Sequence, residues 1–180
     1  MQSIGAVRFA CLLLAAMAAP VAAKVVPAEN GGFISTQHGE TKASPEEVWD
    51  ELVHPERWWN KAHSWSGSAA DFSMTVVPGG CFCEKLPNGG FAEHARVIFA
   101  EPPRVLRLSG AFGPLQGEAL VGTLTIRISP GKNGATAIVF EYAVGGNSRL
   151  ALQDIAPLVD GVMANQHGRL LKQAESRNND

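Results

Sequence analysis

The sequence lacks the short motifs by which many enzymes and nucleotide-binding proteins are recognised. It contains no Gly-x-Ser-x-Gly, no His-Glu-x-x-His, no phosphate-binding loop and no dinucleotide-binding fingerprint. Basic residues number 15 against 17 acidic ones, and there is no basic run, which argues against a nucleic-acid partner or an anionic membrane surface. The five histidines do not have metal-ligand spacing, so we expect neither a metal nor a cofactor.

Long hydrophobic runs are also scarce, and the one clear run lies at the start of the chain. Arg8 precedes an apolar stretch over residues 9–19, and Val21 and Ala23 then occupy the small-residue positions of a cleavage site. The stretch is shorter than the roughly 20 residues that a membrane-spanning helix needs. We therefore expect a signal peptide over residues 1–23 and a periplasmic or secreted product without stable membrane insertion. The alternative is an uncleaved anchor or a buried N-terminal helix.

Cysteine is rare, with three residues in the chain, of which Cys11 would leave with the signal peptide. Cys81 and Cys83 would then remain in an oxidising compartment, where paired cysteines are usually bridged. In an extended strand their Cα atoms would lie about 6.5–7 Å apart, at the limit for a disulfide. A bulge after Gly79-Gly80 would shorten that distance. The alternatives are two buried thiols, or metal or redox chemistry.

The remaining chain forms one predicted domain over residues 24–176, followed by a disordered tail at 177–180. Residues 24–32 are expected to be a flexible lead-in. Period-two and helical patterns predict strands over 33–42, 72–77, 81–86, 91–100, 105–112, 120–128 and 137–144, a helix from Ser44 to Val53, a short helix after Pro55, and a long helix over 148–175. No alternation of strands and helices occurs, so the sheet is antiparallel and the fold class is α+β.

Two sequence signals indicate where the predicted helices begin or bend. Ser44, Pro45 and Glu47 form the N-cap, first-position and third-position signals of a helix start. Pro157 interrupts the pattern of the long helix and is expected to start or kink it. A long helix that follows antiparallel strands packs its apolar face on the sheet, and a bent sheet closed in this way tends to enclose a ligand cavity.

Several segments resemble the START-like helix-grip superfamily (SRPBCC), in the branch of polyketide cyclase/dehydrase-like and chaperone-ATPase-activator-homology proteins. They are residues 43–49 (ASPEEVW) with Pro55 and Trp58-Trp59, residues 77–80 (VPGG), 95–97 (ARV), 101–106 (EPPRVL) and 158–162 (LVDGV). The resemblance implies a curved seven-stranded antiparallel sheet around a long C-terminal helix, two short helices and an apolar cavity. Members of the superfamily bind lipids, sterols, polyketides, hormones or aromatic compounds, and some cyclise or hydrolyse them. Many relatives in this branch are intracellular, so the expected export signal is a difference between this sequence and the branch.

The candidate ligand-binding residues are apolar side chains of alternate strand positions and of the final helix, with a few polar ones. Trp58 and Trp65 are expected at the cavity mouth, while Trp59 is expected to be ordinary packing. The full candidate set is Trp58, Trp65, Phe72, Met74, Glu93, Val97, Phe112, Leu124, Phe140, Val162, Met163 and His167.

The candidate catalytic residues are Glu93 and His94. Glu93 shares a strand face with Ala95 and Val97, so it is expected to point inward, where burial would raise its pKa and suit it to acid/base chemistry. The alternative is a paired or solvated Glu93. A register slip of one residue would bring His94 inward in its place.

These observations predict an exported protein that binds a small hydrophobic or aromatic molecule, rather than an enzyme. The first alternative is a cyclase- or dehydratase-like enzyme, and the second is a scaffold whose cavity is filled by side chains. A cavity below roughly 300 Å³ would favour the scaffold.

Overall fold

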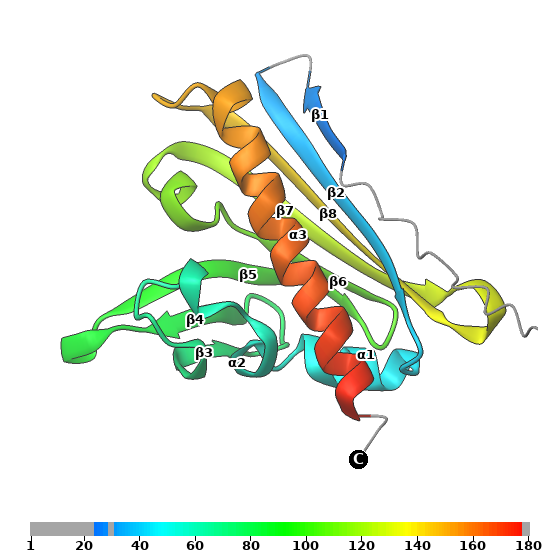
Figure 1. The fold of residues 1–180 in the computed structure, drawn as a ribbon. Helices are drawn as coiled ribbons and strands as arrows, with labels where there is room; N and C mark the ends of the chain where they lie inside the picture. Colours follow the sequence, from blue (N-terminus) through cyan, green and yellow to red (C-terminus); the bar gives the residue numbers. More distant parts are fainter. Residues whose placement is uncertain (1–23, 29–30, 178–180) are drawn as a thin grey trace, which may run out of the picture.

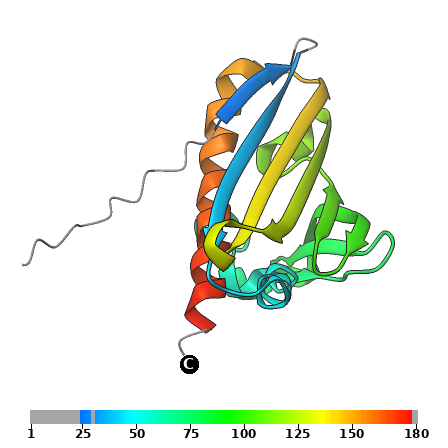
Figure 2. The same cartoon turned by 90° about the vertical axis from the view of Figure 1, so that its right-hand side faces the viewer.

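Eight antiparallel strands form one open, curved sheet in the computed structural model, and a long C-terminal helix lies across one side of it (Figure 1). The structure describes residues 24–28 and 31–177. The predicted signal peptide and the last three residues of the predicted tail lie outside these described residues. Figure 2 shows that the helix covers only one side of the sheet.

The strands pair in the order β1-β2-β8-β7-β6-β5-β4-β3. Their bounds are β1 Lys24–Ala28, β2 Gly32–Thr41, β3 Phe72–Met74, β4 Cys81–Lys85, β5 Phe91–Glu101, β6 Val105–Ser109, β7 Ala119–Pro130 and β8 Thr136–Asn147. The predicted α+β class and antiparallel sheet are confirmed, but the sheet has eight strands rather than seven.

The additional strand is β1, which pairs antiparallel with β2 through contacts such as Val26 with Ile34. It lies within the segment that was expected to be a flexible lead-in, so that expectation was wrong for residues 24–28. Pro27 argues against a strand in this segment, because proline cannot donate a backbone hydrogen bond to a neighbouring strand. Proline is tolerated on an edge strand, and β1 is the edge of this sheet.

Three α-helices accompany the sheet: α1 Pro45–Leu52, α2 Pro55–Trp58 and α3 Leu152–Arg177. The predicted start of α1 is confirmed as a capping box. The Ser44 side chain accepts from the Glu47 backbone N–H, and the Glu47 carboxylate accepts from the Ser44 backbone N–H at 2.7 Å. Helix α3 begins before Pro157 and remains helical through it to Arg177. None of the described helices is long and apolar enough to cross a membrane.

The core lies between the helices and the inner face of the sheet, with buried residues from β2 to β8 as well as from α1 and α3. Alternate residues of β8 are buried, as the period-two pattern predicted, and Phe140 and Tyr142 are at most 1% exposed. Leu170 of α3 is fully buried, which contributes about 1.5–3 kcal/mol of hydrophobic stabilisation for a side chain of this size. The buried residues of α3 are Leu152, Ala156, Met163, Gln166, His167, Leu170 and Ala174.

Polar contacts fix the position of α3 on the sheet. The Asp160 carboxylate accepts hydrogen bonds from Ser35 Oγ and Gln37 Nε2 of β2, each at 2.7 Å. Farther along the helix, His167 Nε2 donates to the Ile138 carbonyl of β8 at 3.0 Å. These buried partners determine which face of α3 meets the sheet, and so which face remains for the site described below.

Candidate ligand cavity

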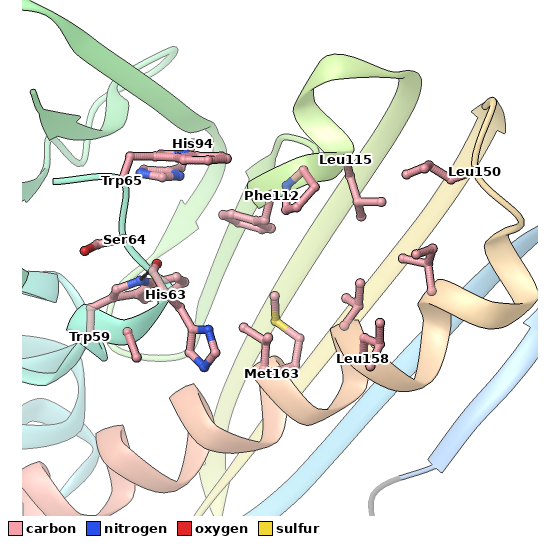
Figure 3. Close-up of a pocket in the computed structure, with 16 residues that line it drawn as sticks. Trp59, His63, Ser64, Trp65, His94, Phe112, Leu115, Leu150, Leu158 and Met163 are labelled. Carbon is pink, nitrogen blue, oxygen red and sulfur yellow. Dashed lines mark hydrogen bonds between the residues drawn. The ribbon is translucent and has the colours of Figure 1, made fainter. Parts of the chain in front are cut away.

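A mostly apolar cavity of about 390 Å³ lies beside α3. Three segments enclose it: the turn of residues 59–65, the loop of residues 112–115 and one face of α3, with Leu150 at one end (Figure 3). The residues that line it are Trp59, Ala62, His63, Ser64, Trp65, His94, Phe112, Gly113, Pro114, Leu115, Leu150, Ile155, Leu158, Val159, Val162 and Met163.

Helix α3 contributes a stripe of apolar residues with helical spacing, including Ile155, Val159 and Val162. Figure 3 shows Met163 and Leu158 on this side of the cavity, opposite Phe112 and His94. Leu158 is 67% exposed, which places it at the open rim. The face of α3 that does not contact the sheet therefore forms one wall of the cavity.

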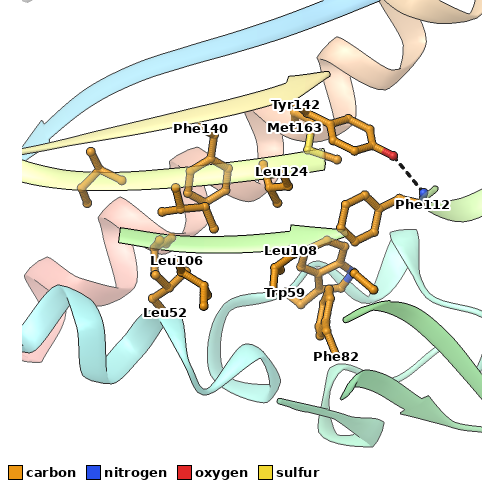
Figure 4. Close-up of a cluster of buried hydrophobic side chains, with 14 of the residues drawn as sticks. Leu52, Trp59, Phe82, Leu106, Leu108, Phe112, Leu124, Phe140, Tyr142 and Met163 are labelled. Atoms are coloured by element: carbon orange, nitrogen blue, oxygen red, sulfur yellow. Dashed lines mark hydrogen bonds between the residues drawn. The ribbon is translucent and has the colours of Figure 1, made fainter. Parts of the chain in front are cut away.

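Tyr142, which lies in the core, holds the loop of residues 112–115 in place. Its hydroxyl accepts a hydrogen bond from the Phe112 backbone N–H at 3.0 Å, drawn in Figure 4. The Phe112 and Tyr142 rings also pack together, with centroids 5.1 Å apart. Leu115 of the same loop is 1% exposed. These contacts anchor the loop that closes the cavity on the side facing α3.

The turn of residues 59–65 is held in place by hydrogen bonds within the turn and to α3. Trp59 Nε1 donates to the His63 carbonyl at 2.9 Å, and the Asn60 backbone N–H donates to Gln166 Oε1 at 3.0 Å. Trp65 is 54% exposed and lies at the rim. The structure places Trp59 in the cavity wall and Trp58 in the core, where its ring lies 6.4 Å from that of Phe140. This reverses the roles expected for these two tryptophans.

A bulge in β5 decides which residues of that strand face inward. Phe82 pairs with Ala95 and Cys83 pairs with Glu93, so His94 is an extra residue that breaks the alternation. His94 is buried at the bulge itself, and Val97 is buried beyond it.

Glu93 faces the other way, which differs from the inward orientation that was expected. Its carboxylate is paired with the Arg96 guanidinium at 2.6 Å, and its side chain is 35% exposed. The expectation rested on an unbroken period of two, and the bulge breaks that period between Glu93 and Ala95.

The same region contains the Cys81–Cys83 disulfide that was one of the expected alternatives. Their Cα atoms are 5.4 Å apart, well within the range for a disulfide. The bulge lies opposite this pair, on β5, rather than after Gly79-Gly80 as was expected.

His94 is joined to a buried carboxylate that the sequence patterns did not single out. Its Nε2 lies 2.9 Å from Glu84 Oε2, and Glu84 is 1% exposed. The backbone N–H groups of Trp65 and Ser66 also donate to the Glu84 carboxylate. Glu84 therefore links His94 to the turn that forms one wall of the cavity. Its place on the same strand face as buried Phe82 was the signal available in the sequence.

The charges of the Glu84–His94 pair follow from burial and hydrogen bonding. Burial alone would raise the pKa of Glu84, but the hydrogen bonds from Ser66, Trp65 and His94 hold that pKa below its usual value. Burial lowers the pKa of His94 despite the opposing effect of Glu84. At neutral pH, Glu84 is therefore ionised and His94 is neutral. Because an ionised carboxylate only accepts, Nε2 of His94 carries the proton.

Of the predicted ligand-binding residues, four line the cavity: Trp65, Phe112, Val162 and Met163. The remaining ones lie elsewhere. Buried Phe72, Val97, Leu124 and Phe140 belong to the hydrophobic core, and Met74 packs against it. His167 is on the face of α3 that packs against the sheet, where it is buried and bonded to the Ile138 carbonyl. Among the described residues, no group of three or more His, Cys, Asp or Glu side chains is arranged to hold a metal ion.

A second cavity, of about 530 Å³, lies between the start of β2 and the start of α3. Its lining includes Phe33, Ser148 and Gln153, and it is more polar than the first cavity. Unlike the first cavity, it is not lined by His94 or by the exposed rim residues Trp65 and Leu158. The first cavity is therefore the better candidate for a specific site, although it is the smaller one.

Comparison of the sequence with protein-family models finds no match, and comparison with curated proteins finds none either. Solved structures do match the fold. SA2116 from Staphylococcus aureus, described as a protein of unknown function, aligns with 84% of this chain and 99% of its own, with a TM-score of 0.60 and 14% identity. EF2215 from Enterococcus faecalis, described likewise, aligns with 86% of this chain and 78% of its own, with a TM-score of 0.59 and 12% identity.

CalU16 from Micromonospora echinospora aligns with 84% of this chain and 80% of its own, with a TM-score of 0.53 and 16% identity. At such identities the similarity shows the fold alone. A curved antiparallel sheet with a long C-terminal helix fits a helix-grip fold.

Proposed function

We propose that the protein binds a small hydrophobic or aromatic molecule in the cavity between the turn of residues 59–65, the loop of residues 112–115 and α3. The observation that carries the proposal is the cavity itself, which is about 390 Å³ in volume and walled mainly by apolar side chains. Ligand pockets usually measure about 300–1,000 Å³, so this space is large enough for a small ligand. The same volume argues against a scaffold whose cavity is filled.

The rim of the cavity supports the same proposal. Trp65 and Leu158 are large apolar side chains that remain 54% and 67% exposed at the opening. Their exposure costs free energy that a ligand would recover by covering them, and aromatic rings contribute large contact areas in such sites. A flat, apolar ligand that reaches from the rim to Phe112 would bury both.

We further propose that the protein acts outside the cytoplasm. The signal-peptide pattern of residues 1–23 supports this placement, and so does the Cys81–Cys83 disulfide, because disulfides persist mainly in oxidising compartments. The cellular location can be measured by fractionation of cells that express the full chain.

Native mass spectrometry tests the binding function directly. Protein purified from the compartment to which it is exported should carry a discrete additional mass, and organic extraction should release a hydrophobic compound. Protein stripped of that compound should bind the apolar fluorescent probe N-phenyl-1-naphthylamine in a saturable manner. A protein that is empty on purification and does not take up the probe would contradict the proposal.

A second candidate function is acid/base catalysis on the bound molecule, and the Glu84–His94 pair favours it. A neutral histidine that borders a cavity and is oriented by a buried carboxylate has the geometry of a general base. Ser64 also lines the cavity, but its hydroxyl is engaged with the Lys61 carbonyl and the Gly67 N–H. The test is to compare compounds extracted from the wild-type protein and from His94→Gln. A mass difference that corresponds to water would indicate a dehydratase, and identical masses would favour binding alone.

A further inference from the structure

His94 is the one buried polar side chain among the residues that line the cavity. His63 is exposed to solvent, and Ser64 has both of its hydrogen-bonding roles filled within the turn. The Trp59 indole N–H is likewise bonded to the His63 carbonyl. Among the side chains that line this apolar space, His94 is therefore the one that is placed to make a directional polar contact deep inside it.

The two ring nitrogens of His94 have different roles. Nε2 carries the proton and donates to Glu84 Oε2 at 2.9 Å. Nδ1 is then a hydrogen-bond acceptor, since a neutral imidazole has one donor and one acceptor. No described residue is hydrogen-bonded to Nδ1, whereas Nε2 is engaged by Glu84. Because His94 lines the cavity, Nδ1 is the ring nitrogen that is left for a partner there.

The ring is also fixed in orientation. It stacks on Phe72 with centroids 5.1 Å apart and an interplanar angle of 18°, and it packs against Phe82 at 5.4 Å. Glu84 is itself held by the backbone N–H groups of Trp65 and Ser66. The imidazole thus has no freedom to exchange its two nitrogens without losing the bond to a buried carboxylate, a loss that is costly for both groups.

We propose that His94 Nδ1 is the specificity-determining acceptor of the cavity, and that the ligand is an apolar ring compound with a hydroxyl group, such as a phenol or an alicyclic alcohol, that donates to it. This inference rests on the proposed binding function and narrows the class of ligand. A site built to pair with a hydroxyl discriminates against the analogue that lacks it, because the buried acceptor is then left unpartnered.

The test compares two probes of similar shape, 2-naphthol and 2-methylnaphthalene, as competitors of N-phenyl-1-naphthylamine. Each is measured on the wild-type protein, on His94→Gln and on His38→Gln. The amide nitrogen of a glutamine at position 94 reaches the place of Nε2 and can still donate to Glu84, but no atom replaces Nδ1. His38→Gln is the matched control, because His38 is exposed and does not line the cavity.

We expect His94→Gln to raise the dissociation constant of 2-naphthol, relative to that of 2-methylnaphthalene, by about fivefold to tenfold. This is the usual contribution of one neutral hydrogen bond. The ratio of the two dissociation constants should be unchanged in His38→Gln, which should bind both probes as the wild-type protein does. A ratio that is the same in wild type and His94→Gln would overturn this inference alone. Failure of every competitor to bind the wild-type protein would overturn the proposed function and this inference with it.

A measurement on the wild-type protein does not depend on the folding of a variant. The 15N chemical shift of His94 Nδ1 should move toward that of a hydrogen-bonded acceptor when 2-naphthol is added, and should stay in place with 2-methylnaphthalene. Equal shifts with both probes, or a resting state in which Nδ1 carries the proton, would overturn the inference.

Discussion

The Tyr142 hydroxyl joins the core to the cavity wall by two hydrogen bonds to the backbone of one loop. It accepts from the Phe112 N–H at 3.0 Å and donates to the Gly110 carbonyl at 3.1 Å. Burial raises the pKa of this phenol, so the hydroxyl keeps the proton that it donates. The loop that carries Phe112 is therefore anchored from β8, and the shape of the cavity depends on a residue that does not line it.

Replacing Tyr142 by phenylalanine should lower the free energy of unfolding by about 1–2 kcal/mol, because a buried N–H and a carbonyl lose their partner while the ring packing remains. Urea unfolding measures this change. The affinity for N-phenyl-1-naphthylamine should fall as well, since the Phe112 wall loses an anchor. Ser176→Ala, which removes an exposed hydroxyl, is the control and should change stability by less than about 0.5 kcal/mol. A Tyr142→Phe protein as stable as the wild type would show that the two bonds contribute nothing net.

Gly122 makes the approach of Tyr142 to this loop possible. A Cβ atom at position 122 would lie 2.2 Å from the Gly110 carbonyl oxygen and 2.6 Å from the Tyr142 hydroxyl oxygen. Gly122→Ala should therefore destabilise the protein by about 2 kcal/mol or more, within the range observed when an overpacked core must shift. Gly145→Ala on neighbouring β8 is the matched control, because a Cβ atom there meets nothing within 4 Å. Thermal unfolding of the two variants side by side checks the prediction, which fails if both have the same melting temperature.

Much of the fold could be predicted from the sequence because its local patterns agree with its tertiary contacts. The buried alternation of β8 and the capping box of Ser44 and Glu47 are local signals that the structure retains. Strand β1 could not be predicted, since Pro27 argues against a strand unless the segment is known to lie at a sheet edge. Edge position is a property of the whole sheet and is not contained in a short window of residues.

The candidate site was harder to predict, because it depends on the register of β5. Both His94 and Val97 are buried, although they are three residues apart on a strand, because the bulge makes His94 an extra residue of β5, opposite the step from Phe82 to Cys83 of β4. Sequence periodicity indicates that either Glu93 or His94 faces inward. It does not give the position of the bulge, which determines that His94 is the inward one. The partner carboxylate, Glu84, lies on a different strand, so its contact with His94 depends on that pairing.

Stability should decrease as the pH falls below about 6.5, the ordinary pKa of histidine. Burial lowers the pKa of both His94 and His167 in the folded protein, so the unfolded chain binds protons first as the pH falls and gains stability relative to the folded state. The pKa of Glu84 is also lowered, which adds a further loss below about pH 4.5. Urea unfolding between pH 8 and pH 5 measures the first effect. His167→Gln should give a shallower slope in that range, and a stability that rises toward pH 5 would contradict the assignment.

Filling the cavity should abolish ligand binding without unfolding the protein. Val162 lies on the wall formed by α3 and is only partly buried, so a tryptophan at this position can extend into the cavity. We expect Val162→Trp to weaken the binding of N-phenyl-1-naphthylamine by at least about tenfold, because the loss of contact area corresponds to more than about 1.4 kcal/mol. Val121→Trp makes the same change at a position of β7 that is 67% exposed and does not line the cavity, and it should bind the probe within about twofold of wild type. If Val162→Trp binds the probe as well as Val121→Trp does, the ligand occupies a different part of the molecule. The cavity between the starts of β2 and α3 would then become the next site to block.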